Sequence, residues 1–189
     1  MTGANARAHA RDNRSSSVGE SECGSTVTPP FPPPIKTPAT ASAVNELTVT
    51  NAATGNAVAL AATGDDTNID LSLAGKGTGM VKANASYGDW TDNADGATVT
   101  FNMATTNRHR VTLGGNRTLA VSNVKAGQSF VLRLLQDGTG SRTVTWFSTI
   151  KWAGGAAPTL TTTAGKADLI GFICTSAGNY DGFVVGQNI

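Results

Sequence analysis

Short alternating runs of apolar and polar residues fill residues 44–83, and Gly, Asn and Asp turns separate them. The runs lie at residues 47–49, 58–60, 69–73 and 80–81. The alternation is strict in Asn68-Ile69-Asp70-Leu71-Ser72-Leu73, which predicts a strand with one apolar face. Each run is too short to form a core alone. We therefore expect this segment to be stabilised by stacking on copies of itself, in the same chain or in neighbouring chains.

We predict that residues 43–84 form a short trimeric stem resembling a β-prism, whose apolar faces meet on a shared axis. Seven apolar side chains are the expected trimer core: Leu47, Val49, Val58, Leu60, Ile69, Leu71 and Leu73. Their burial between three chains would drive association.

A longer series of strand-like segments covers residues 85–189, which we predict to be a compact all-β domain. The expected strands lie near residues 97–102, 109–113, 118–121, 129–136, 143–147, 167–175 and 180–186. Gly-rich turns separate them, for example Gly114-Gly115-Asn116 and Asp137-Gly138-Thr139-Gly140. Strands at this spacing predict a β-sandwich or jelly roll. The segments around residues 131–135 and 169–173 are the most apolar, so we expect them at its centre.

Proline dominates the end of residues 1–42, where Thr28 to Pro38 reads TPPFPPPIKTP. Proline fixes φ and lacks an N–H donor, so this stretch is expected to be extended. A disordered linker and an anchoring arm both fit this composition. Phe31 and Ile35 favour the arm, because a solvated linker has little use for them. The predicted anchor is Phe31, Pro32, Pro33, Pro34 and Ile35.

Low charge limits the classes of partner. Of the 189 residues only 14% are charged, and the net charge is +1, so we expect no nucleic-acid binding. No apolar run approaches the roughly 20 residues that span a bilayer, so we expect no membrane insertion. The first residues lack the apolar stretch of a secretory signal. Cys174 lies in an apolar segment and is expected to pack in the core. Cys23 lies in a polar segment, and an inter-subunit bridge between the two cysteines stays open.

Two stretches of the chain resemble the stem of bacteriophage fibre proteins: residues 50–56 (TNAATGN) and residues 62–79 (ATGDDTNIDLSLAGKGTG). Residues 113–119 (LGGNRTL), 127–128, 136–146 (QDGTGSRTVTW), 151–155 (KWAGG) and 158–160 are similar to a β-domain common at the ends of phage virion proteins. The resemblance implies a homotrimeric structural protein of the virion, assembled in the bacterial cytoplasm, whose residues 1–42 dock on capsid, neck or tail proteins. Head fibre, collar whisker, tail fibre and decoration protein all remain open.

Catalytic and metal-binding motifs are weak in this chain. The run Gly75-Lys76-Gly77-Thr78-Gly79 lacks the spacing of a phosphate-binding loop and is interpreted as a turn. Asp65, Asp66, Asn68 and Asp70 are oxygen ligands without a Glu at the calcium-loop position. Residues 85–189 contain no Glu, and no Gly-x-Ser-x-Gly motif accompanies either His. We expect no enzyme activity, no cofactor and no metal.

Recognition of a host-surface glycan is the alternative function. Aromatic faces stack on the apolar faces of sugars, and Arg side chains bind acidic polysaccharide. The candidate contacts are Trp152, Tyr180, Arg108 and Arg110. Core packing competes for the aromatic residues, and we expect it for Trp146. For the Arg residues the competing interpretation is a solvated sheet face, or pairing between subunits with Asp137 or Asp168.

Overall fold

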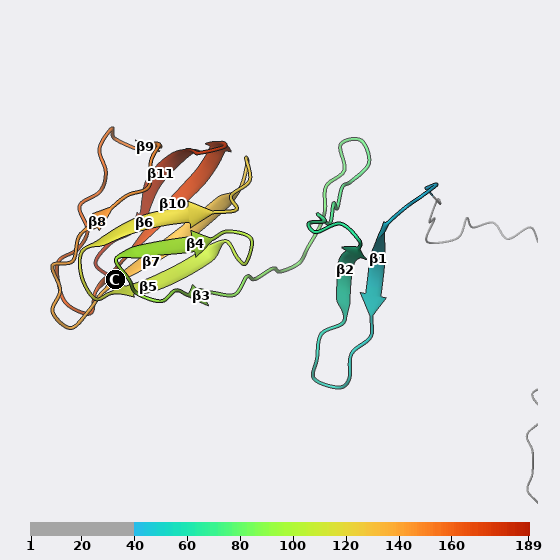
Figure 1. The fold of residues 1–189 in the computed structure, drawn as a ribbon, viewed down its shortest axis with the longest axis horizontal. Helices are drawn as coiled ribbons and strands as arrows, with labels where there is room; N and C mark the ends of the chain where they lie inside the picture. The colour runs from blue at the N-terminus through green and yellow to red at the C-terminus, as the bar shows by residue number, and fades with distance from the viewer. Residues whose placement is uncertain (1–39) are drawn as a thin grey trace, which may run out of the picture. The chain divides into compact units, whose positions relative to one another are not determined.

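The structure is a computed structural model that describes residues 40–189 (Figure 1). The chain divides into two compact units, Met1–Lys76 and Gly77–Ile189. Residues 40–189 contain strands and turns and no helix, so the prediction of an all-β protein is confirmed. The predicted anchor, Phe31 to Ile35, and Cys23 lie outside the described residues.

The described part of the first unit is a β-hairpin of β1 (Asn45–Thr50) and β2 (Ala59–Gly64). The strands are antiparallel and place Leu47 opposite Ala62 and Val49 opposite Leu60. On the opposite face the hydroxyls of Thr48 and Thr63 lie 2.6 Å apart. Both strands match predicted apolar runs. The strand predicted over residues 68–73 is absent from the single chain, where these residues pair with neither β1 nor β2.

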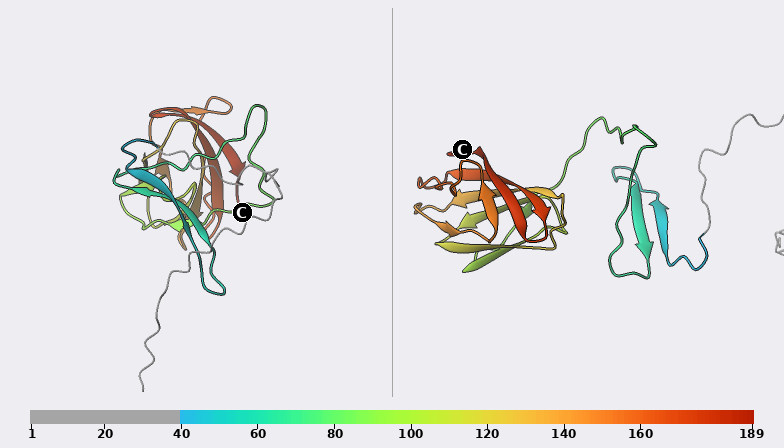
Figure 2. Two further views of the ribbon diagram at one scale, coloured as in Figure 1. Left: turned by 90° about the vertical axis from the view of Figure 1, so that its right-hand side faces the viewer. Right: turned by 90° about the horizontal axis from the view of Figure 1, so that it is seen from above.

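The second unit contains two β-sheets (Figures 1 and 2). The six-stranded sheet has the order β3 (Thr91–Asp92), β5 (Arg108–Leu113), β7 (Ser129–Gln136), β10 (Ala167–Ser176), β11 (Asn179–Gly186) and β9 (Ile150–Trp152). The three-stranded sheet has the order β4 (Thr98–Asn102), β6 (Arg117–Ser122) and β8 (Val144–Thr145). The two most apolar predicted strands, β7 and β10, lie at the centre of the larger sheet, as expected.

The chain alternates between the two sheets from β4 to β8. Neighbours within one sheet are therefore two strands apart in sequence and run in the same direction: β4 with β6, β6 with β8, and β5 with β7 are parallel pairs. A jelly roll is built from antiparallel Greek keys. The two-layered all-β arrangement agrees with the predicted β-sandwich. The parallel pairs differ from the connectivity of a jelly roll. Antiparallel pairing is found only later in the sheet, for β7 with β10 and for β10 with β11.

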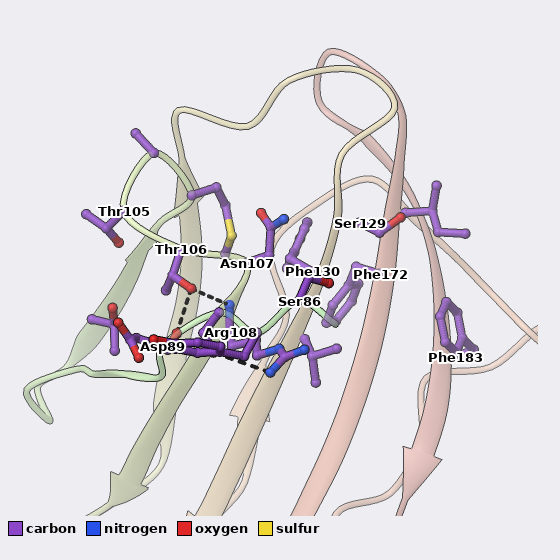
Figure 3. Close-up of a pocket in the computed structure, with 17 residues that line it drawn as sticks. Ser86, Asp89, Thr105, Thr106, Asn107, Arg108, Ser129, Phe130, Phe172 and Phe183 are labelled. Atoms are coloured by element: carbon purple, nitrogen blue, oxygen red, sulfur yellow. Dashed lines mark hydrogen bonds between the residues drawn. The ribbon is translucent and has the colours of Figure 1, made fainter. Parts of the chain in front are cut away.

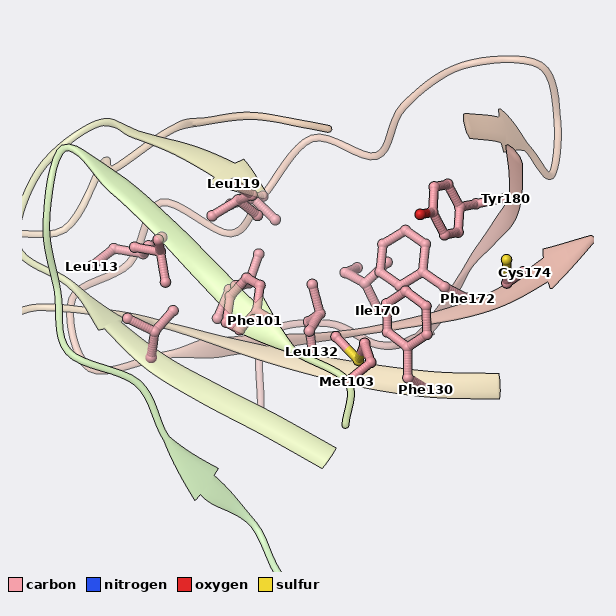
Figure 4. Packing of buried hydrophobic residues seen from close by; sticks show 14 residues of the cluster. Phe101, Met103, Leu113, Leu119, Phe130, Leu132, Ile170, Phe172, Cys174 and Tyr180 are labelled. Atoms are coloured by element: carbon pink, nitrogen blue, oxygen red, sulfur yellow. The ribbon is translucent and has the colours of Figure 1, made fainter. Parts of the chain in front are cut away.

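Apolar side chains from both sheets fill the space between them (Figure 4). In β5 every second residue is buried, so that His109, Val111 and Leu113 face inward. The fully buried side chains include Phe101 and Leu119 from the smaller sheet, and Leu132 and Phe172 from the larger one. The prediction that Cys174 is buried is confirmed, and its thiol is free.

The chain between β8 and β9 departs from the predicted strand at residues 143–147. The strand stops at Thr145 because the next two residues, Trp146 and Phe147, pack against the core instead of continuing the ladder. The Trp146 ring centroid lies 4.9 Å from that of Trp152 and 5.9 Å from that of Phe172. The expected core packing of Trp146 is thus confirmed. The short strands β3 and β9 were not predicted.

Candidate functional site

One face of the hairpin carries large apolar side chains that are exposed to solvent. Leu47, Val49 and Leu60 are 58%, 69% and 47% exposed, and Ala62 lies on the same face. We call these four residues the stem apolar face. Val58, Leu71 and Leu73 are also exposed, and Ile69 is half-buried. Within one chain, the residues of the predicted trimer core therefore do not form a core.

The predicted glycan contacts do not converge. Arg108 and Arg110 share the exposed face of β5, as the alternation predicts. Trp152 lies in β9 at the far edge of the same sheet and packs against Trp146 and Phe172. Tyr180 is buried, with its ring against Phe130 and Phe147. Burial removes Tyr180 from any surface that a sugar reaches in this structure.

Arg side chains of the second unit, Arg110 exposed and Arg117 half-buried, pair with carboxylates of the same chain. Arg110 binds Asp92 with an Nη2–Oδ2 distance of 2.8 Å, and Arg117 binds Asp95 with an Nε–Oδ1 distance of 2.8 Å. These hydrogen bonds lower the pKa of both carboxyl groups.

The two carboxylates considered for pairing between subunits are also engaged within the chain. Arg142 donates to Asp137 (Nη2–Oδ2, 2.8 Å), and the pKa of Asp137 falls to about 2. Asp168 is buried and accepts from the backbone N–H and the hydroxyl of Thr161, at 2.6 and 2.7 Å. These contacts hold the loop before β10. Both carboxylates therefore have partners within the chain, and pairing of the Arg residues with Asp137 or Asp168 of another subunit stays a prediction.

His109 is fully buried, and its two ring nitrogens are hydrogen-bonded. Nε2 lies 3.1 Å from the carbonyl oxygen of Thr106, so it must carry the proton and donate. Nδ1 then accepts from the side-chain amide of Asn93 at 3.1 Å. Burial lowers the pKa of the imidazole, which keeps it neutral. This arrangement holds the 103–107 loop against β5 and offers no free base.

The part of the chain that the structure describes has no group of three or more His, Cys, Asp or Glu residues able to hold a metal ion. The Gly75–Gly79 turn is not followed by a helix, so it lacks the N-terminal amides that bind phosphate. Over residues 40–189 there is also no helix long and apolar enough to cross a bilayer.

A pocket of about 780 Å³ opens at one end of the second unit (Figure 3). One wall is the segment 86–91, and the other is the loop 103–108 that precedes and begins β5. Side chains of β7, β10 and β11 line the rest, among them Ser129, Phe172 and Phe183.

Among the predicted site residues within 40–189, only Arg108 lines this pocket. Asp89, Asn107 and Phe183 come from three separate stretches of sequence. No local sequence motif predicts this pocket, because its residues come together only when the strands pair.

Residues 90–178 match the family model described as "Putative phage tail fibre C-terminal domain". The match begins next to β3 and ends at the turn after β10, so it covers most of the two-sheet unit. The comparisons with curated proteins and with solved structures found no match. The resemblance to phage fibre proteins is confirmed. This match, which covers most of the two-sheet unit, supports the assignment of the chain as a structural fibre protein of a bacteriophage.

Proposed function

We propose that the chain forms a homotrimeric fibre of the virion, in which the stem apolar face of each copy packs against those of two others. The observation that carries this proposal is the exposure of Leu47, Val49 and Leu60 on one face of a regular hairpin. Large apolar groups gathered on one face of a small element are typical of an interaction surface.

The energetics favour association over an isolated hairpin. A two-stranded hairpin without a covering layer is marginally stable in water. Burying a Val or Leu side chain contributes about 1.5–3 kcal/mol when the burial is complete. A trimer contains three copies of each exposed Leu and Val residue of the stem, and all of them can be buried in its shared core. The shared core then supplies the stability that the single hairpin lacks.

The apolar segment after the hairpin fits the same arrangement. Residues 68–73 keep their strict alternation, yet the single chain gives them no strand partner. We propose that in the trimer they pair with neighbouring copies, which places Leu71 and Leu73 in the shared core. Residues 1–42 then serve as the arm that docks on the particle, a proposal that rests on the proline-rich pattern around Phe31 and Ile35.

The test compares neighbouring positions on opposite faces of β2. Leu60 lies opposite Val49 on the stem apolar face, whereas Ala59 lies opposite Thr50 on the other face. We expect Leu60→Asp and Leu71→Asp to convert the trimer to monomers in sedimentation velocity, because a carboxylate would be buried among apolar groups. Ala59→Asp should leave the trimer intact. A trimer that survives both Leu variants, or a monomeric wild-type chain, would refute the proposal.

A second candidate function is recognition of host-surface carbohydrate by the C-terminal domain. The observation that favours it is the open pocket of Figure 3, which combines aromatic and hydrogen-bonding side chains in one concave site. A fibre that anchors at one part of the chain and binds at another would perform both functions.

A further inference from the structure

We infer that the pocket between residues 86–91 and residues 103–108 binds a neutral saccharide. The inference rests on the second candidate function above and adds to it a defined site and a ligand class. Trp152 and Tyr180 take no part in it, because neither residue lines the pocket.

The two walls of the pocket are tied together by hydrogen bonds (Figure 3). The Thr106 hydroxyl donates to the carbonyl oxygen of Asp89 at 2.7 Å, and Arg108 Nη1 donates to the carbonyl oxygen of Gly88 at 3.3 Å. The backbone N–H of Arg108 in turn donates to the Thr106 hydroxyl at 3.2 Å. The buried His109 holds the same loop, because its ring Nε2 donates a hydrogen bond to the carbonyl oxygen of Thr106. A pocket with fixed walls loses less conformational entropy when it binds a ligand.

Polar groups in the pocket are available in the combination that sugar hydroxyls require. The hydrogen bond from Thr106 engages the backbone carbonyl of Asp89, so the Asp89 carboxylate is left to accept from a ligand. The Asn107 carbonyl oxygen accepts from Gln128 Nε2 at 2.7 Å, which leaves the two amide N–H groups of Asn107 to donate. An acceptor and a donor on opposite walls match adjacent hydroxyls, each of which is both donor and acceptor.

Aromatic and aliphatic side chains supply the apolar part of the pocket. The Tyr87 side chain is 88% exposed, and Phe183 is 39% exposed. The Phe183 ring packs directly on the backbone of Gly171, where an added Cβ would lie 2.5 Å from the ring atom Cε2. That contact covers one side of the ring and fixes its position. Aromatic faces held in this way stack on the C–H faces of a pyranose ring.

The charges of the pocket select the ligand class. Asp89 and Arg108 are the two charged residues among those that line it, and their charges cancel. The pocket therefore has no net field to attract an acidic polysaccharide or a cationic peptide. Its volume of about 780 Å³ lies within the range of about 300–1,000 Å³ that is common for small-molecule sites. A short neutral oligosaccharide satisfies both conditions.

The experiment uses the full chain on an array of immobilised neutral oligosaccharides (glucose, galactose, mannose and N-acetylglucosamine units) and acidic ones. Titration calorimetry with the best soluble oligosaccharide follows. We expect Tyr87→Ala and Asp89→Asn each to weaken binding at least about 10-fold, which equals about 1.4 kcal/mol. The matched control is Asp181→Asn, an exposed carboxylate on β11 outside the pocket, and it should bind as the wild type does. Because Tyr87 and Asp89 are exposed, all three variants should unfold at the wild-type temperature.

Each outcome has one meaning. Binding to neutral sugars that both pocket variants weaken supports the inference. Neutral binding that the variants leave unchanged overturns this site but keeps the second candidate function. Binding to acidic saccharides alone overturns the ligand class. The absence of binding to any saccharide overturns both the inference and the second candidate function, whereas the trimer is judged separately by sedimentation.

Discussion

In the C-terminal domain the apolar face of the larger sheet packs on a second sheet, whereas in the hairpin the apolar face is exposed to solvent. Leu132 and Phe172 of the larger sheet are fully buried. Leu47 and Val49 of the hairpin come from an equally regular alternation but remain more than half exposed. The difference shows that alternation determines which face of a strand is apolar, while the covering layer must come from elsewhere.

The two regions should therefore differ in what their stability depends on. A domain that covers its own apolar surface folds with a free energy that does not depend on protein concentration. A surface covered by other copies makes stability depend on protein concentration through mass action.

Cutting the chain between the two compact units gives the largest expected effect. The fragment 77–189 should unfold cooperatively at a midpoint that does not change with its concentration, because its core is complete. The fragment 1–76 should show a β-sheet signal that appears only as concentration rises. Circular dichroism over a 100-fold dilution series is the measurement. A hairpin fragment that stays folded at the lowest concentration would remove the contrast between the regions.

Two neighbouring residues of β10 test the core of the C-terminal domain. Phe172 points inward and is fully buried, whereas Ile173 points outward and is partly exposed. We expect Phe172→Ala to lower the free energy of unfolding by about 3–5 kcal/mol, because it leaves a cavity between the sheets. Ile173→Ala should cost about 1 kcal/mol or less, in line with a partly exposed site. Urea denaturation of the fragment 77–189 measures both, and equal losses would contradict the assigned faces.

The sequence was most informative where local chemistry decides the structure. Alternation predicted β5, β7, β10 and β11 within one or two residues, and the apolar composition of β7 and β10 predicted their central position. The Gly-rich turns at residues 114–116 and 137–140 also lie between strands, as expected. The family assignment followed from short phrases such as QDGTGSRTVTW, which lie within the matched region.

Features that depend on pairing between distant segments could not be predicted. The parallel connectivity arises because β4 pairs with β6 rather than with β5, and both choices satisfy the same alternation. The strand β3 has two residues and no periodicity, yet it pairs with β5 and places residues 86–91 beside the pocket. Tyr180 was considered for glycan contact because its sequence neighbours do not show that Phe130 and Phe147 cover its ring.

The smallest expected effect concerns a turn of the C-terminal domain, where Asp137 binds Arg142. This pair, together with the backbone N–H groups of Gly140 and Thr139, lowers the pKa of Asp137 from 3.8 to about 2. A carboxyl group with a lowered folded-state pKa adds stability above its unfolded pKa, and that contribution is lost as pH falls from about 4 to about 2.

In Arg142→Gln the pKa of Asp137 should rise toward 3.8 without reaching it, because the two N–H donors remain. The loss of stability between about pH 4 and about pH 2 should therefore become smaller. Carboxyl NMR titration of the fragment 77–189 measures the pKa, with Lys151→Gln as a control, because Lys151 is an exposed charge that does not contribute to the shift of the Asp137 pKa. If Arg142→Gln left the pKa of Asp137 at about 2, the ion pair would not be its cause, and the backbone donors of the turn would have to account for the whole shift.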